Sequence, residues 1–222
     1  KRARILQIGQ RPESFWSVIV NEGELIVDGG KLDVLGEFKM DTTASAAGWR
    51  NYVCTNYLTV RNGGRFRQLG GGTTFGLNGN QDKRVECITV TGTGSRYEIA
   101  ATAGNVTTEC ATDLNVQDGG VFETHKTMNM SAGYAANVNN RTRIVVSGAG
   151  SKYDGADSSL YLARKSEMLV EDGAEAIRGL RELAAEPTPP DGPWTAVKKS
   201  EKSVRVAFFY DQGGKNNLGV GE

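Results

Sequence analysis

The sequence predicts an all-β fold of stacked coils, because two motifs recur in it at one spacing. The first motif occupies residues 54–66 and returns at 110–122, with six of thirteen positions identical, 56 residues later. The second occupies residues 88–97 and returns at the same spacing at 144–153. Since two separate motifs share one period, the chain is a repeat protein.

A period of 56 residues is too long for one β-coil and suits two coils of about 28 residues each. The motifs contain short, β-branched, alternating strands, which exclude helical repeats. Leucine-rich repeats are excluded because their asparagine ladder and helix are missing. A parallel β-helix is therefore the first prediction and a β-sandwich the second. The residues expected to point inward and stack are Leu58, Val60, Ile88, Val90, Leu114, Val116, Ile144 and Val146.

The N-terminal part already carries the strand pattern. Residues 5–9 are a candidate first strand, and residues 18–20 and 25–27 follow as alternating apolar segments broken by Gly, Asn and Asp. Because residues 25–30 repeat the first motif with one residue fewer, we expect the solenoid to begin near Phe15.

Between the motifs lie polar, glycine-rich stretches that are expected to be loops. The segments 67–84 and 123–141 fall at the same phase of the repeat, and residues 39–52 form another small, polar stretch. Insertions at one phase of a solenoid gather on one face, which is often its binding face. This face is the expected place for a ligand.

The repeat returns a third time and then stops. Aligning Met168 with Leu114 gives an offset of 54, and Ala174 replaces the second glycine of the motif. Residues 174–186 have the apolar spacing of an amphipathic helix, which would cover the open end of the solenoid. The sequence thus divides into a β-helix over 1–175 and a C-terminal part over 176–222.

The C-terminal part is expected to contain the cap helix, a link, a strand and a tail. A Pro- and Lys-rich link over 187–202 leads to an apolar strand over 204–210 and then to a Gly- and Asn-rich tail. The strand belongs to no repeat. It is therefore expected to pair with the solenoid edge or with another chain, which would give a homo-oligomer.

Composition excludes several classes of partner. Lysine and arginine (26) balance aspartate and glutamate (26), so there is no electrostatic case for nucleic acid or an anionic membrane. No apolar run is long enough to form a transmembrane segment. The chain opens with Lys-Arg-Ala-Arg and shows no signal peptide.

The three cysteines are predicted to be free thiols. Cys54 and Cys110 occupy equivalent repeat positions, so two coils would separate them by roughly 9 to 10 Å. That distance exceeds the reach of a disulfide. The repeat does not place Cys87.

The two motifs resemble the autotransporter-type β-helix repeat of secreted bacterial passenger proteins. Residues 92–97 and 148–153, each after Ile-x-Val, match its V-x-G-x-G-S-x-aromatic segment, and residues 114–120 match its L-x-V-x-x-G-G segment. The resemblance covers about residues 18–175 and implies a right-handed parallel β-helix exported to a bacterial surface. The family carries no catalytic residues to transfer. The membrane barrel is absent, and the chain from residue 175 onward has no counterpart.

Few residues point to chemistry. His125 is the only histidine, which excludes a two-histidine metal site and leaves a Ser-His-Asp triad without a supporting motif. The glycine pairs at 63–64 and 119–120 lack the Lys-Ser/Thr of a phosphate loop and are expected to be corners with positive φ. Tyr97 and Tyr153 would share one column. They could form an aromatic strip that binds sugars, but a packing role at the corner is favoured.

The acidic residues are candidates for glycoside cleavage or calcium binding. They are Asp113, Asp118, Asp154, Asp157 and Asp172. However, Asp118 and Asp172 fall at matching turn positions that Asn62 also fills, as turn chemistry alone would select. We therefore assign no catalytic, cofactor-binding or metal-binding residue and expect no cofactor.

The sequence favours a non-enzymatic, secreted or cell-surface module, structural or adhesin-like, with a carbohydrate or host-surface ligand as a candidate partner. The alternative is a polysaccharide lyase or glycoside hydrolase on the same scaffold, which would need a carboxylate pair about 5 to 10 Å apart in one groove. A second alternative is a self-assembling fibre or viral spike subunit joined through strand 204–210.

Overall fold

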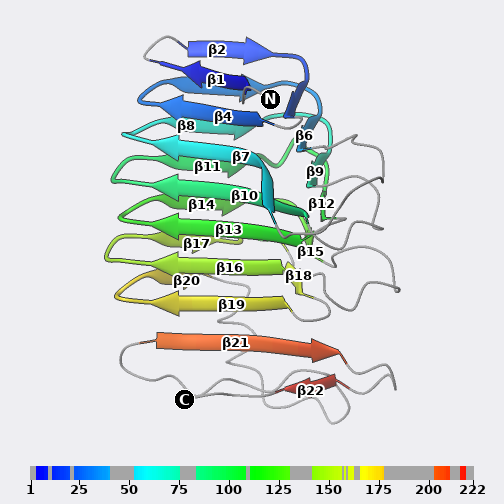
Figure 1. Cartoon of the computed structure of the whole chain (residues 1–222), viewed down its shortest axis with the longest axis vertical. Helices are drawn as coiled ribbons and strands as arrows, with labels where there is room; N and C mark the ends of the chain where they lie inside the picture. The colour runs from blue at the N-terminus through cyan, green and yellow to red at the C-terminus, as the bar shows by residue number, and fades with distance from the viewer. Residues whose placement is uncertain are drawn as a thin grey trace.

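The chain folds into a right-handed parallel β-helix, as the sequence predicts (Figure 1). This computed structural model describes residues 4–9, 12–20, 23–40, 53–75, 84–108, 111–130, 142–156, 158, 160–162, 166–177, 203–210 and 216–218. Three sheets run along the solenoid. Among the described residues, six coils contribute one strand to each sheet in turn, and a seventh contributes to two of them. The β-sandwich alternative is therefore wrong.

Sheet A holds the longest strands of the coils. In spatial order it contains β1 (Arg4–Ile8), β4 (Gly23–Asp28), β7 (Val53–Arg61), β10 (Arg84–Thr91), β13 (Ala111–Gln117), β16 (Thr142–Ser147), β19 (Ser166–Glu171), β21 (Ser203–Tyr210) and β22 (Asn216–Leu218). All pairs from β1 to β19 are parallel, whereas β21 and β22 add antiparallel strands.

Sheets B and C are parallel throughout. Sheet B contains β2 (Pro12–Phe15), β5 (Lys31–Val34), β8 (Arg65–Gln68), β11 (Arg96–Ile99), β14 (Val121–Thr124), β17 (Lys152–Asp154) and β20 (Glu175–Ile177). Sheet C contains β3 (Val18–Val20), β6 (Phe38–Met40), β9 (Thr73–Phe75), β12 (Val106–Thr108), β15 (Met128–Met130) and β18 (Leu160–Leu162). The stretches 67–84 and 123–141, predicted to be loops, contain strands β9 and β15, so that prediction is wrong there; residues 76–83 and 131–141 lie outside the described residues.

The 56-residue period spans two coils. Leu58 pairs with Ile88 on the next coil, and Ile88 pairs with Leu114 on the coil after that. The first step is 30 residues and the second 26, so residues 56 apart lie in one column, two coils apart. The same column continues to Ile144 and Met168. The predicted stacking is confirmed.

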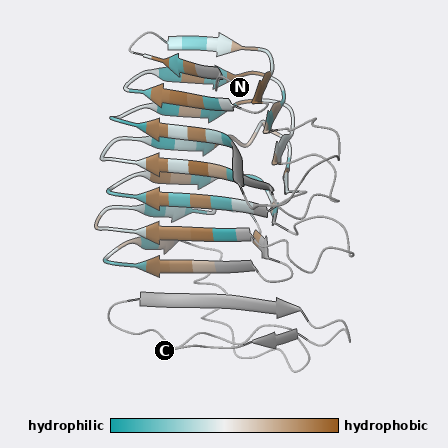
Figure 2. Cartoon of the chain, in the orientation of Figure 1, coloured by the Kyte–Doolittle hydropathy of each residue, from teal (hydrophilic) through white to brown (hydrophobic). Residues whose placement is uncertain are grey.

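The core is a set of such columns inside the triangle of sheets. All eight residues predicted to point inward are at most 1% exposed. Figure 2 shows hydrophobic residues along the strands of sheet A and hydrophilic ones at the corners beside them. Beneath sheet B an aromatic column continues through successive coils, and its ring centroids lie between 4.7 and 5.5 Å apart. It consists of Phe66, Tyr97, Phe122 and Tyr153. Burial of each such side chain contributes roughly 1.5 to 3 kcal/mol.

Two kinds of corner alternate between sheets A and B, which explains why the period covers two coils. In one kind, Asn62 and Gly63 both have positive φ; in the other, Gly92 and Gly94 do. The second kind ends in the fully buried Ser95, whose Oγ accepts a hydrogen bond from Gly63 N–H of the preceding coil at 3.0 Å.

The same interlock recurs one period later. Ser151 Oγ accepts a hydrogen bond from Gly119 N–H at 2.9 Å. Each serine corner thus hydrogen-bonds to the glycine corner of the coil before it, so the two motifs depend on one another. The predicted corner role of the glycine pairs is confirmed for Gly63 and Gly119, which have φ of 76° and 84°.

The solenoid starts earlier than expected. β1 at Arg4–Ile8 already pairs with β4, and β2 with β5, so a start near Phe15 is wrong while the candidate strand at 5–9 is confirmed. Leu6 and Phe15 occupy interior columns yet are 49% and 38% exposed, because β1 and β2 are edge strands.

The other end differs from the predicted cap. Glu175–Ile177 forms strand β20 in register with β17, so the predicted helix over 174–186 is wrong at its start; residues 178–186 lie outside the described residues. The strand predicted at 204–210 lies in β21, which pairs antiparallel with the solenoid edge at β19. The described part of the chain contains no helix, and hence none that could cross a bilayer.

Cys87 is disulfide-bonded, so the prediction of free thiols is wrong for this residue. The prediction considered residues two coils apart, whereas Cys87 lies on the coil between them. Its register partners on the neighbouring strands are Tyr57 and Asp113, so the bond joins cysteines that are out of register.

Candidate functional site

The acidic residues singled out from the sequence do not converge. Asp113 lies on the outer face of sheet A, and Asp154 on the outer face of sheet B. Asp118 and Asp172 lie at corners with φ of 54° and 55°, as Asn62 does, which confirms turn chemistry as the reason for these three residues. Asp157 lies outside the described residues.

Carboxylates instead gather in a column that the sequence did not reveal. Glu98, Glu123 and Asp154 are register partners on three successive strands of sheet B. Their side chains point outward, since the residue before each of them on its strand belongs to the buried aromatic column. Neighbouring strands put these positions about 4.8 Å apart, which meets the spacing expected of a catalytic carboxylate pair.

Cations occupy the adjacent column and neutralise these acids. Arg96 contacts Glu98 at 3.9 Å and is also paired with Glu123 on the next coil. Lys152 Nζ lies 2.8 Å from Asp154 Oδ2. The column is therefore a ladder of ion pairs along sheet B, which we call the sheet B ladder.

His125 belongs to the same ladder. Its Nε2 lies 2.7 Å from Glu123 Oε1, directly after β14. In the described part of the chain no serine hydroxyl is bonded to the ring, so the structure assembles no Ser-His-Asp triad there.

The ladder continues toward the N-terminus through Asp33. Arg67 holds this carboxylate with two hydrogen bonds, Nε to Oδ1 at 2.8 Å and Nη2 to Oδ2 at 2.7 Å, and Lys31 adds a contact at 3.2 Å. The Arg67 hydrogen bonds hold the pKa of Asp33 below its ordinary value, and the same pairing raises the pKa of Arg67. A carboxylate kept ionised in this way is suited to a structural ion pair.

One carboxylate lies inside the solenoid. Glu86 is 1% exposed and accepts a hydrogen bond from Asn56 Nδ2 at 3.2 Å. Asn56 Oδ1 in turn accepts from Gly23 N–H at 3.4 Å, and Thr112 follows Glu86 in register. These residues form a buried polar column through four coils, beside the apolar column that contains Leu58 and Ile88.

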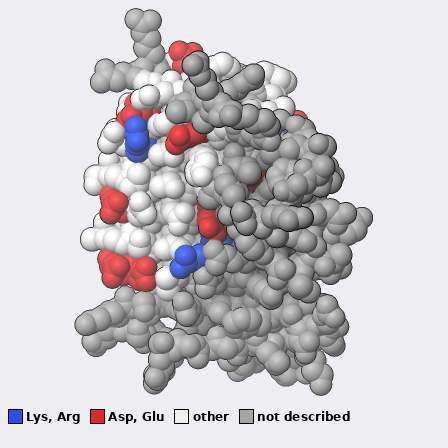
Figure 3. Space-filling view, viewed as in Figure 1, with Lys and Arg blue, Asp and Glu red and all other residues white. Residues whose placement is uncertain are grey.

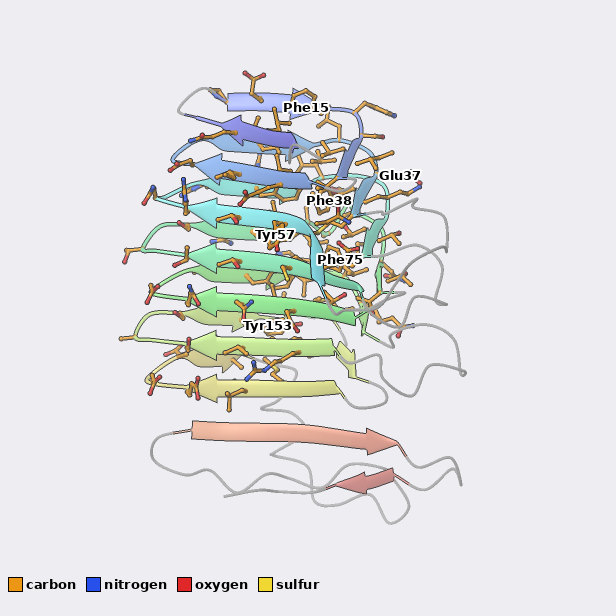
Figure 4. The ribbon with its side chains drawn as sticks, viewed as in Figure 1. Phe15, Glu37, Phe38, Tyr57, Phe75 and Tyr153 are labelled. Atoms are coloured by element: carbon orange, nitrogen blue, oxygen red, sulfur yellow. The ribbon has the colours of Figure 1, made fainter. Side chains whose placement is uncertain are left out.

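The tyrosines fill the core, so the proposed sugar-binding aromatic strip is wrong. Tyr97 and Tyr153 are 0% and 4% exposed and share one column with Phe122 between them. Burial raises the pKa of both phenols. Figure 4 shows Tyr153 with Phe38 and Phe75 among the enclosed side chains; Tyr57, on β7, is 40% exposed.

The outer face of sheet A carries a group of uncharged polar side chains. Its middle strands carry Thr89, Asn115, Gln117 and Ser147 on the outside, each half-buried. Figure 3 shows this side of the molecule, with charged residues scattered around uncharged ones. The same face also carries the Arg61–Asp28 ion pair at 3.0 Å, and Asp113 in register with Arg143, so the amides and hydroxyls lie between charged positions.

Neither a metal centre nor a relative identifies the chain further. Among the described residues, no three His, Cys, Asp or Glu side chains gather in a way that could hold a metal ion. The sequence and the fold together define the class, a right-handed parallel β-helix protein. Comparisons with known protein families, curated proteins and solved structures found no match.

Proposed function

We propose that the protein is a non-enzymatic, structural or adhesin-like β-helix module that works outside the cytoplasm, like the autotransporter passengers that its two motifs resemble. The sheet B ladder is the observation that carries this proposal. In this ladder, Glu98, Glu123 and Asp154 lie on neighbouring strands, and Arg96 or Lys152 neutralises each of them. A general acid needs a proton and a raised pKa, which an arginine or lysine partner opposes.

The regular build of the solenoid supports a structural role. Seven coils stack in register, the corners interlock through buried serines, and ion pairs cross from coil to coil on the outside. Such a rod holds the side chains of its outer faces at a fixed spacing from coil to coil. Enzymes on comparable scaffolds would instead need a carboxylate that is free to exchange a proton.

The bonded Cys87 supports a location outside the cytoplasm. Disulfides persist in oxidising compartments and are rare where thiols are kept reduced. This feature agrees with the export that the resemblance to passenger proteins implies.

An activity screen tests the proposal. The purified chain is incubated with neutral and acidic polysaccharides, and both reducing ends and the unsaturated products of lyases are measured. We expect no turnover by the wild type. Turnover that disappears in Glu123→Gln but survives in Glu37→Gln would contradict the proposal, because Glu37 pairs with Lys39 away from the ladder.

A further inference from the structure

Four uncharged side chains form one continuous patch on the outer face of sheet A. Thr89 on β10 is in register with Asn115 on β13, and Gln117 on β13 is in register with Ser147 on β16. We call these four residues the amide–hydroxyl patch. All are half-buried, so each side chain is held in place while its polar end remains accessible.

The patch is set apart by its unused hydrogen-bonding groups. Its neighbours on the same face are engaged: Thr59 Oγ1 donates to Glu24 at 3.4 Å, and Thr91 Oγ1 donates to Asp118 at 3.0 Å. The four patch side chains make no hydrogen bond within the described structure. Two amides and two hydroxyls therefore present donors and acceptors together, without a charge.

The spacing of these groups is fixed by the sheet. Successive coils lie about 4.8 Å apart, and alternate residues on one strand lie roughly 6.7 Å apart. The patch is thus a flat grid of donors and acceptors, which fits an extended, flat ligand better than a compact one. Tyr57, 40% exposed on β7 of the same sheet, adds an aromatic surface toward the N-terminal end of the solenoid.

We propose that the amide–hydroxyl patch binds a neutral, ribbon-like polysaccharide of the β-1,4-linked glucan type. Sugar hydroxyls donate and accept hydrogen bonds at once, as the Asn115 and Gln117 amides do. An acidic chain is disfavoured because none of the four patch side chains is a cation, and the arginines on the same face are matched by acids: Arg61 pairs with Asp28 at 3.0 Å, and Arg143 is in register with Asp113. The inference rests on the proposed function in one respect: because the protein is proposed to be non-enzymatic, the polysaccharide must be released without cleavage.

The test is a titration of the whole chain with cellohexaose, followed by amide and side-chain NMR shifts. We expect the signals of Thr89, Asn115, Gln117 and Ser147 to move together, and Asn115→Ala/Gln117→Ala to weaken binding roughly tenfold or more. The matched control is Thr74→Ala/Thr107→Ala, two outward, in-register positions of sheet C, which should bind as the wild type does.

Three results would overturn the inference. The first is no shift of the patch signals at about 10 mM cellohexaose. The second is an equal loss of affinity in the control variant. The third is equally tight binding of an oligogalacturonate of the same length. Chain shortening of cellohexaose is read separately by mass spectrometry: cleavage with intact patch binding would refute the proposed function and leave the patch assignment standing.

Discussion

Removing one interlocking serine should destabilise the protein far more than removing a serine on its surface. Ser95 is fully buried, and its Oγ accepts the Gly63 N–H at 3.0 Å. Ser95→Ala leaves that N–H without its acceptor between two coils, where water has poor access. A buried donor left unpaired costs about 1 to 3 kcal/mol. The free energy of unfolding should fall by about that amount.

Equilibrium urea unfolding measures this loss. Ser147→Ala is the matched control, because Ser147 is half-buried on the outer face and its hydroxyl makes no hydrogen bond to the residues that the structure describes. This variant should change stability by less than about 0.5 kcal/mol. Ser151→Ala should match Ser95→Ala, since it breaks the same bond one period later. The double variant should show the sum, as the sites lie two coils apart. A Ser95→Ala midpoint equal to that of Ser147→Ala would refute the interlock.

Three further predictions concern a corner, the ladder and the cysteines. Gly120→Ala should lower the free energy of unfolding by about 2 to 3 kcal/mol, because its Cβ would lie 2.4 Å from Val90 O. Gly63→Ala, whose Cβ meets nothing within 4 Å, should lower it only by the αL penalty of about 1 to 2 kcal/mol. Equal unfolding midpoints of the two variants would contradict this reasoning. Arg67 lowers the pKa of Asp33, so the stability from this pair is present above the unfolded pKa of about 4 and is lost as pH falls through the lower folded pKa. Asp33→Asn should therefore destabilise the protein at pH 7 and flatten the loss of stability below about pH 4. An unchanged acid profile would exclude the pair as the source of that loss. Thiol titration of the unfolded, unreduced chain should find one free thiol among three cysteines, and three would show that the disulfide of Cys87 is absent.

The sequence was sufficient for the architecture because the columns are written in it directly. Leu58 and Leu114 each begin an L-x-V strand, and apolar alternation with a corner glycine identifies a buried column without any other information. The same regularity identified the corners, since Asn62 and Asp118 occupy equivalent positions of the repeat and both residue types favour turns.

The sequence failed where a contact joins residues of different repeats. Nothing local shows that Ser95 accepts the Gly63 N–H from another coil, or that Glu86 points inward to Asn56. The disulfide of Cys87 was missed because only residues at equal phase were compared. The strand at Glu175–Ile177 has a helical apolar spacing, but pairing with β17 overrides that local preference.

The candidate surfaces could be foreseen least. Outward residues are not constrained by packing, so the pairing of Glu123 with Arg96 and the unused groups of Asn115 and Gln117 become visible only when neighbouring coils are in place. Of the predicted acids, Asp118 and Asp172 are turn residues, whereas Asp154 lies in the sheet B ladder.

Methyl–methyl NOEs from a selectively labelled sample test the order of the coils most directly. The account predicts a ladder of contacts in which Ile88 reaches both Leu58 and Leu114, while Leu58 and Leu114, about 9.6 Å apart, show none to each other. A direct NOE between Leu58 and Leu114, with Ile88 reaching neither, would make 56 residues a single coil and contradict the alternating corners, the interlock and the outer-face grid together.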